Sequence, residues 1–365
     1  MESLSNVRTH SAELIIDSSK IISNISELRS LISYKSKFMF VVKSNAYGHG
    51  LNKIVLNLED YVDAFGVVRL DEAISIRHLS SKPILLMQGI YTDREMQIAK
   101  EKNIQIVIHN MDQFRLITEK DKWNVPSYNS EGIGLWIKIN TGMNRLGLSL
   151  EELKLVYEKG IIGSDSVLMT HMACADNPED PMNKIQINNF EEAFNLINRK
   201  SKRSICNSAC LINFPELSYD WVRSGIAAYG GEFGNLNLKT AMTFRAPIIS
   251  IRKIKKGERV GYGGRKKASK DMRIAIVYAG YADGIPQTAI DGTKVIINDR
   301  EAEIFGRVSM DLVSIDITNT TNVSDNDFVT FWSEKLPINE FSNKNGLISY
   351  ELMTRIGSRV SVTVI

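Results

Sequence analysis

The sequence has few cysteines and no long apolar run. Only three of its 365 residues are cysteine, Cys174, Cys206 and Cys210, and they form neither a CxxC pair nor a zinc-ligand spacing. Such a set is typical of free thiols in a reducing compartment rather than of a disulfide framework. The N-terminus lacks a basic region followed by an apolar core, and no apolar run approaches membrane-spanning length. We therefore expect a cytoplasmic protein without a membrane partner.

An excess of one charge is also missing. The 45 basic and 42 acidic residues leave a formal net charge of +3, which is too small to indicate a nucleic-acid partner. The five histidines, His10, His49, His78, His109 and His171, show no ligand pairing, so the sequence predicts no metal site. With 43% hydrophobic and 24% charged residues, the composition is that of a globular protein with ample material for a core.

Apolar runs alternate with helical periods through the first 240 residues. This alternation predicts βαβ units and a parallel sheet, and about eight repeats in this length match one TIM-like (β/α)8 barrel. The expected barrel strands are Phe38–Asn45, Asp63–Val68, Pro83–Gly89, Ile104–Asn110, Leu135–Thr141, Ser166–His171, Arg203–Asn207 and Trp221–Ala228. Expected helices between and before them include Ile21–Ile32, Leu70–Leu79, Glu95–Glu101, Glu151–Lys159 and Lys184–Arg199.

The pattern changes near Thr240. From Met242 onward the apolar runs are short and separated by turns, which predicts a mainly antiparallel β domain. The expected elements there are Ile248–Ile251, Ile274–Val277, Lys294–Ile297, Leu312–Ile317, Phe328–Phe331, a helix at Ser349–Ile356 and a last strand at Arg359–Ile365. We therefore expect a barrel domain over residues 1–240 and a β-rich domain over 241–365. A short strand at Ala12–Ile16 can cross over to join the second domain.

The stretch FMFVVKSNAYGHG, residues 38–50, places Lys43 where a buried strand meets turn-forming residues. Burial disfavours the charged form of a lysine and pushes it toward the neutral amine. Neutral amines form Schiff bases with carbonyl compounds, pyridoxal phosphate included. The alternative is a lysine that ends a strand and extends its ammonium to water. This stretch alone does not decide between the two.

Further polar groups fall at the carboxyl ends of the expected strands, where barrel enzymes place their chemistry. They are Tyr47, Lys138, Arg145, His171, Ser208, Arg223 and Gly225. Singly, each has a structural explanation: a core histidine, a salt-bridge arginine, a helix-capping serine. Together they would be costly to bury without a ligand. The Ser208 hydroxyl and the amides near Gly225, at an expected helix start, favour phosphate, so the lysine and the phosphate site together indicate pyridoxal phosphate.

Eight stretches carry a family resemblance. VVKSNAYGHG, INTGMNRLGL, THMACAD, CNSA, VRSGIAAYG, VGYGG, GYADG and GRVSMD occur in that order between about Ala12 and Val362. As an ordered set they closely resemble the alanine racemase family. The resemblance implies a pyridoxal-phosphate-dependent homodimer with an N-terminal barrel and a C-terminal β domain. It also implies an isomerase that interconverts L-alanine and D-alanine and supplies D-alanine for peptidoglycan.

The resemblance also implies roles for individual residues. Lys43 would bind the cofactor covalently and act as one base, and Tyr262 from the partner subunit would be the second base. The implied phosphate contacts are Tyr47, Ser208, Gly225, Ile226 and Tyr350. Arg223 would face the pyridine nitrogen, His171 would pack beside the ring, Arg145 would meet the ring phenolate and the substrate, and Met310 and Tyr281 of the partner would line the substrate site. Lys138 resembles a lysine that some members carry as a carbamate.

Two residues depart from the family pattern, and three other functions compete. Ser224 stands where the family usually has proline, and Ser44 where alanine is common. The competing functions are a broader small-amino-acid racemase that also accepts serine, a barrel-type amino-acid decarboxylase, and a non-catalytic pyridoxal-phosphate carrier. The decarboxylases place a carboxylate at the ring nitrogen, so Arg223 argues against them. A single-barrel carrier would have no use for a domain that contains Tyr262 and Met310.

Overall fold

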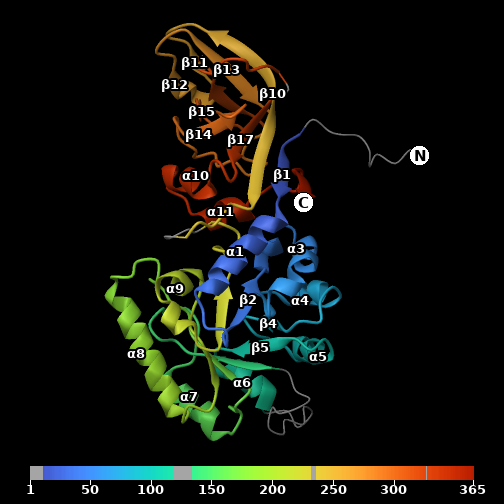
Figure 1. Ribbon diagram of the computed structural model, residues 1–365, viewed down its shortest axis with the longest axis vertical. Helices are drawn as coiled ribbons and strands as arrows, with labels where there is room; N and C mark the ends of the chain where they lie inside the picture. Colours follow the sequence, from blue (N-terminus) through green and yellow to red (C-terminus); the bar gives the residue numbers. More distant parts are fainter. Residues whose placement is uncertain (1–10, 119–133, 232–235, 326) are drawn as a thin grey trace, which may run out of the picture. The chain divides into compact units, whose positions relative to one another are not determined.

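The computed structural model describes residues 11–118, 134–231, 236–325 and 327–365 (Figure 1). The chain divides into two compact units. The barrel unit comprises residues 22–228 and 232–238, and the β unit comprises residues 1–21, 229–231 and 239–365. Each unit is described by itself.

Eight parallel strands form the sheet of the barrel unit, in the order β8-β7-β6-β5-β4-β3-β2-β9. Their bounds are β2 Lys37–Val41, β3 Ala64–Val67, β4 Ile84–Leu86, β5 Gln105–Ile108, β6 Leu135–Lys138, β7 Val167–Met169, β8 Lys202–Ser204 and β9 Trp221–Ser224. The two ends of the sheet meet, because Asp220 N donates to Arg203 O at 3.2 Å and Arg223 N donates to Cys206 O at 3.0 Å. The parallel barrel predicted from the sequence is therefore confirmed.

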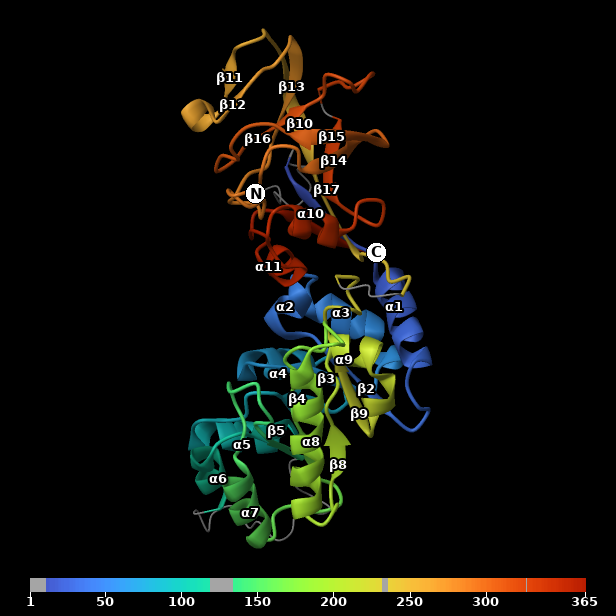
Figure 2. The ribbon, with the colours of Figure 1, turned by 90° about the vertical axis from the view of Figure 1, so that its left-hand side faces the viewer.

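Helices lie around these strands (Figure 2). They are α1 Ser18–Ser30, α3 Leu51–Leu58, α4 Leu70–Arg77, α5 Asp93–Glu101, α6 Met111–Thr118, α7 Leu150–Glu158, α8 Pro181–Leu196 and α9 Ser208–Asn213. Capping boxes begin two of them: Thr92 and Glu95 exchange side-chain and backbone hydrogen bonds at α5, as Ser149 and Glu152 do at α7. These bonds satisfy backbone donors that a helix start leaves without partners.

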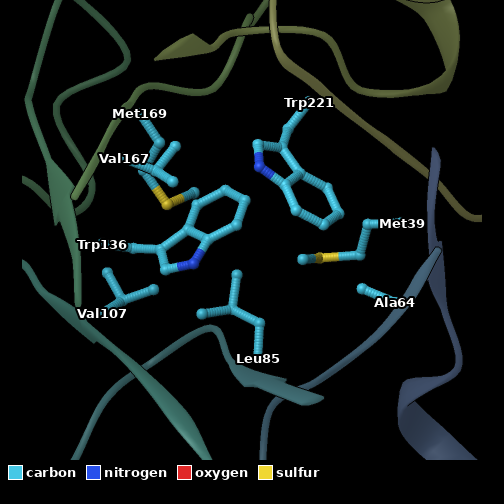
Figure 3. Close-up of a cluster of buried hydrophobic side chains, with 8 residues drawn as sticks. All are labelled: Met39, Ala64, Leu85, Val107, Trp136, Val167, Met169 and Trp221. Carbon is cyan, nitrogen blue, oxygen red and sulfur yellow. The ribbon is translucent and has the colours of Figure 1, made fainter. Parts of the chain in front are cut away.

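Large side chains fill the barrel interior (Figure 3). Eight buried residues from the strands form the cluster: Met39, Ala64, Leu85, Val107, Trp136, Val167, Met169 and Trp221. The rings of Trp136 and Trp221 tilt against each other with their centroids 5.6 Å apart. The interior is thus a packed core, and polar chemistry is left to the rim.

The β unit is one eight-stranded sheet in the order β13-β16-β15-β14-β17-β10-β1-β18. Its strands are β1 Glu13–Ile16, β10 Met242–Ile254, β13 Met272–Val277, β14 Lys294–Ile297, β15 Arg300–Ile304, β16 Val313–Asp316, β17 Phe328–Trp332 and β18 Ser361–Val364. A separate two-stranded ribbon joins β11 Arg259–Val260 to β12 Lys266–Lys267, and two helices, α10 Ile338–Lys344 and α11 Ser349–Thr354, follow β17. The strand β1 pairs antiparallel with β10 and parallel with β18. The mainly antiparallel second part of the predicted fold is confirmed.

The strand β10 is much longer than the sequence indicated. The apolar run Ile248–Ile251 predicted a short strand, whereas β10 has 13 residues and contacts β1, β17 and β13 along its length. The prediction was too short because the first residues of β10 alternate apolar and polar side chains. At the other end, Arg252 and Lys253 end the apolar run, but the backbone ladder continues through them to Ile254. In the parts of the chain that the structure describes, no helix has the length and apolar character needed to cross a membrane.

Replacing Leu85 with alanine tests the packing of the barrel interior. Leu85 is fully buried, so the Leu85→Ala variant should lose about 2–5 kcal/mol of the free energy of unfolding through lost transfer energy and an unfilled cavity. Leu56→Ala is the matched control, because Leu56 is 56% exposed on a helix of the same unit and its loss should cost far less. Urea unfolding followed by tryptophan fluorescence measures both, and equal losses would contradict a packed interior.

Candidate functional site

The turn after β2 has an unusual backbone. The sequence predicted a strand from Phe38 to Asn45, but β2 ends at Val41 and Lys43–Tyr47 form the single turn α2. Four successive residues in it are left-handed, with φ values of 54°, 55°, 53° and 52° from Ser44 to Tyr47, and Gly48 follows at 79°. This conformation costs roughly 1–2 kcal/mol for each residue with a side chain. The surrounding structure must therefore hold the turn in place.

Hydrogen bonds from several directions hold this turn. Ala46 N donates to Val42 O at 2.9 Å, and Gly48 N donates to Ser44 O at 3.0 Å. The Asn45 side-chain oxygen accepts from Leu51 N at 2.8 Å, and the Glu72 carboxylate accepts from Ser44 N at 2.6 Å. The sequence analysis did not find Glu72, because its partner lies 28 residues away and no local pattern marks the contact.

His49 supports the same turn from inside. Its Nδ1 lies 3.0 Å from Ala46 O and 2.9 Å from Tyr47 O. Burial lowers the pKa of His49 to about 4, so the ring is neutral at physiological pH and can donate from Nδ1. The sequence analysis considered His49 only as one of five histidines that lack metal-ligand spacing. Its position in AYGHG is the signal that it belongs to the turn.

Lys43 precedes the left-handed residues and lies among other basic groups. Burial is the main cause that lowers the pKa of the Lys43 amine; the nearby Arg145 charge lowers it further, and Glu72 raises it. This is the direction that the sequence predicted for a lysine at the end of a buried strand. The Nζ atom lies 6.0 Å from the centre of the Tyr47 ring. Lys43 is thereby shifted toward the neutral, nucleophilic amine.

The carboxyl ends of the strands gather further basic side chains. Burial lowers the pKa of Lys138, at the end of β6, to about 8, and the charges of Arg223, Arg145 and Lys43 contribute. Burial, assisted by the same cations, lowers the pKa of His171 well below its ordinary value, so this histidine is neutral. Lys138 pairs with Met169 on β7, and Arg223 donates to Thr170 O next to His171, so the structure brings these sequence-predicted residues to one rim. Such a concentration of positive charge favours an anionic ligand.

Arg223 is fixed by oxygen acceptors that follow β7 and that lie at the end of β8. Its guanidinium donates to Thr170 O at 2.6 Å and to the Ser204 hydroxyl, and Ser204 Oγ in turn donates to Trp221 O at 2.8 Å. Burial lowers the pKa of Arg223 to about 10, which still leaves it protonated at neutral pH. Ser204 is a second site residue that the sequence analysis missed, because its neighbours in the sequence give no sign of the arginine it accepts from.

The loops after β8 and β9 form a compact polar cradle. Ser208 Oγ accepts from Gly225 N at 3.1 Å and from Ala227 N at 3.4 Å, and it lies 3.1 Å from Ser224 Oγ. A methyl group added at Gly225 would lie 2.6 Å from the Tyr47 hydroxyl, so only glycine leaves room there. Tyr47, Ser208 and Gly225 therefore lie next to one another.

Two expectations about these loops have clear outcomes. The helix start expected at Gly225 was wrong: residues 226–230 form turns, and Ala228 N donates to Gly225 O at 2.9 Å, while Ile226 is buried. A helix does begin at Ser208, where the Asn207 side chain accepts from Cys210 N at 3.0 Å.

The free thiols predicted from the sequence are confirmed for Cys174, Cys206 and Cys210.

The other predicted site residues belong to the β unit. Tyr281 N donates to Ser309 O at 3.0 Å and Ala282 N donates to Met310 O at 3.1 Å, so the Tyr281 turn and the Met310 loop lie together. Arg265 ties the Tyr262 turn to the same loop by donating to Gly306 O at 2.8 Å. Tyr262 and Met310 are 72% and 53% exposed. Tyr350 lies on α11.

The fold and the rim define a barrel enzyme with a lysine of lowered pKa at the carboxyl ends of its strands. Two family descriptions match the sequence: "Alanine racemase, N-terminal domain" over residues 16–232 and "Alanine racemase, C-terminal domain" over residues 241–364. Together they cover nearly the whole chain. The chain belongs to the alanine racemase family, so the resemblance seen in the sequence motifs is confirmed.

Individual relatives agree with this assignment. The alanine racemase of Mannheimia succiniciproducens is 39% identical over 337 residues, covering 89% of this chain and 91% of the relative. The solved alanine racemase of Acinetobacter baumannii is 35% identical, covers 98% of this chain and 100% of its own, and has a TM-score of 0.90. The alanine racemase of Bartonella henselae, solved with covalently bound pyridoxal phosphate, shares the fold at a TM-score of 0.88, with 24% identity and coverage of 98% and 100%.

Glycine at position 44 tests the left-handed turn. Because Ser44 has a φ of 54°, Ser44→Gly should relieve strain and raise the free energy of unfolding by up to about 1 kcal/mol. Ser75→Gly, in the middle of the ordinary helix α4, should instead lower it by about 0.5–1 kcal/mol. Chemical denaturation compares the two variants, and a loss of stability in Ser44→Gly as large as that in Ser75→Gly would contradict the turn geometry.

Proposed function

We propose that this chain is a pyridoxal-phosphate-dependent isomerase that interconverts L-alanine and D-alanine and supplies D-alanine for peptidoglycan synthesis. The observation that carries the proposal is Lys43 on its strained turn, with a lowered pKa, beside the cradle made by Tyr47, Ser208 and Gly225. Membership of the alanine racemase family supports the reaction and the substrate. A cytoplasmic location stays a prediction from the sequence.

The rim residues fit the proposed cofactor. Ser208, Tyr47 and the amides near Gly225 and Ile226 would hold its phosphate, since hydroxyls and backbone N–H groups are good phosphate donors. Arg223, held by Thr170 O and Ser204, would donate to the pyridine nitrogen, His171 would pack beside the ring, and Arg145 would meet the ring oxygen and the substrate carboxylate. When bound, the cofactor would withdraw electrons from the α carbon of alanine and make its proton removable.

Racemisation then needs two bases on opposite faces of the α carbon. Lys43 Nζ would hold or return the proton on one face, because its lowered pKa favours the neutral amine, which can accept a proton. Tyr262 Oη of the partner subunit would do the same on the other face. Arg223 and the neutral His171 would lie near that tyrosine.

A homodimer with shared sites follows from this assignment. The barrel unit would form the cofactor-binding domain, and the β unit would supply Tyr262, Tyr281 and Met310 to the site of the partner subunit. The exposure of Tyr262 and Met310 supports this, because both large side chains are open to water in the single chain. The hydrogen bonds that tie their turns together would present them as one surface.

Replacing Tyr262 with phenylalanine tests the two-base assignment. Purified protein with pyridoxal phosphate should convert L-alanine to an equal mixture of enantiomers, and Tyr262→Phe should slow this by about 10²–10⁴-fold. The variant should also stop exchanging the α proton of L-alanine with solvent while Lys43 still exchanges that of D-alanine. Chiral chromatography and deuterium washout measure both, with Tyr278→Phe, a half-exposed tyrosine of the same unit, as the control.

Other products would support the competing functions. Carbon dioxide release without D-alanine would indicate a decarboxylase, and a bound but inert cofactor would indicate a carrier. Racemisation of serine at a rate similar to that of alanine would indicate the broader racemase. Equal exchange of both enantiomers by Tyr262→Phe would contradict the role of Tyr262.

Lys138 should form a carbamate, in which its nitrogen bonds to the carbon of carbon dioxide and releases a proton. A pKa of about 8 leaves roughly a tenth of the Lys138 amines neutral at pH 7, and the charges of Arg145 and Arg223 would stabilise the anionic product. With ¹³C-bicarbonate, the protein should show a carbamate carbon signal by NMR that is missing in Lys138→Met. The exposed Lys154→Met variant should retain it. A signal that survives in Lys138→Met would contradict this assignment.

A further inference from the structure

Glu72 joins the start of α4 to the turn that follows Lys43. Its Oε2 accepts from Val68 N and Arg69 N, each at 3.1 Å, and so caps the helix. Its Oε1 accepts from Ser44 N at 2.6 Å. Bonds from amides to a carboxylate are shorter and stronger than bonds between neutral groups. One side chain therefore fixes a helix start and the residue directly after Lys43.

Two other glutamates in the chain have the capping role alone. Glu95 Oε2 accepts from Tyr91 N at 2.6 Å and Thr92 N at 3.1 Å at the start of α5, and Glu152 Oε2 accepts from Ser149 N at 2.8 Å at the start of α7. Each stays at its own helix start in these bonds. Glu72 differs because its second oxygen reaches across to another element, and that element carries Lys43.

The charge of Glu72 also acts on the Lys43 amine. The other groups linked to this amine are basic or aromatic: Arg145 acts on Lys43, Lys43 in turn acts on Lys138 and His171, and the centre of the Tyr47 ring lies 6.0 Å from Nζ. Arg145 lowers the pKa of Lys43, whereas Glu72 raises it. Among these groups in the described parts of the chain, Glu72 supplies the negative charge.

We propose that Glu72 is a positioning residue for Lys43: through Ser44 it locks the left-handed turn that aims the amine, and it holds a carboxylate charge against the residue next to that lysine. The inference rests on the proposed function, in which Lys43 reacts with the aldehyde of pyridoxal phosphate. In that step the Lys43 nitrogen attacks the aldehyde carbon and the aldehyde oxygen leaves as water. The two effects of Glu72 are separable. The hydrogen bond to Ser44 N depends on the length of the side chain, and the effect on the amine depends on its charge.

The experiment follows the capture of pyridoxal phosphate by Lys43 in cofactor-free full-length protein. Borohydride reduces the new bond at timed intervals, and mass spectrometry measures label at Lys43 across a range of pH. Glu72→Gln removes the charge, so the pKa of Lys43 should fall and the pH of half-maximal capture should move down by roughly 0.5 units. Glu72→Asp keeps the charge but shortens the reach, so the midpoint should hold while the maximal rate falls about tenfold.

Glu95→Gln is the matched control, because it removes the same helix cap at α5 without touching the Lys43 turn. It should leave the midpoint and the maximal rate at wild-type values. Wild-type behaviour in both Glu72 variants, or an equal shift in Glu95→Gln, would overturn the inference. If wild-type protein carries label on other lysines but not on Lys43, the proposed cofactor function fails, and this inference fails with it.

Discussion

The site depends on a backbone turn that is unfavourable on its own. Ser44, Asn45, Ala46 and Tyr47 are all left-handed, a conformation that residues with side chains avoid. Bonds to Val42, Leu51 and Glu72, and the buried His49, hold it. The direction of the Lys43 side chain is therefore set by the packed structure around it rather than by a freely moving loop. Strain of this kind is typical of sites that must hold a reactive group in one orientation.

A second constraint is the accumulation of basic groups at one rim. Lys43, Lys138 and His171 all have pKa values lowered by burial, and neighbouring cations add to the effect. Burying positive groups together is unfavourable unless anions join them. A ligand with a phosphate and a phenolate, and a substrate with a carboxylate, would supply those anions. The same repulsion leaves the amines closer to their neutral, reactive forms.

Much of this arrangement could be predicted from the sequence. The alternation of strands and helices predicted the barrel. The ends of the expected strands predicted five rim residues: Lys43, Lys138, His171, Ser208 and Arg223. Both predictions were possible because the spacing of apolar residues and the position along a strand are local properties of the sequence. The left-handed turn could not be predicted, since serine, alanine and tyrosine have no preference for it and only the glycines hint at a tight bend. Glu72 and Ser204 were missed because their partners lie far away in the sequence. The length of β10 was missed because its polar positions hide a continuous ladder.

The barrel closes only when its last strand, β9, is in place between β8 and β2. The proposed cofactor groups come from opposite ends of the barrel unit: Lys43 follows its first strand, and Arg223 and Gly225 belong to its last. During synthesis the lysine leaves the ribosome some 180 residues before its partners, by the numbering of the chain. A nascent barrel that ends before Arg223 has the amine but neither the arginine nor the complete phosphate cradle. Cofactor capture would thus come after barrel closure. Binding would stabilise only those chains in which the first and last strands have joined.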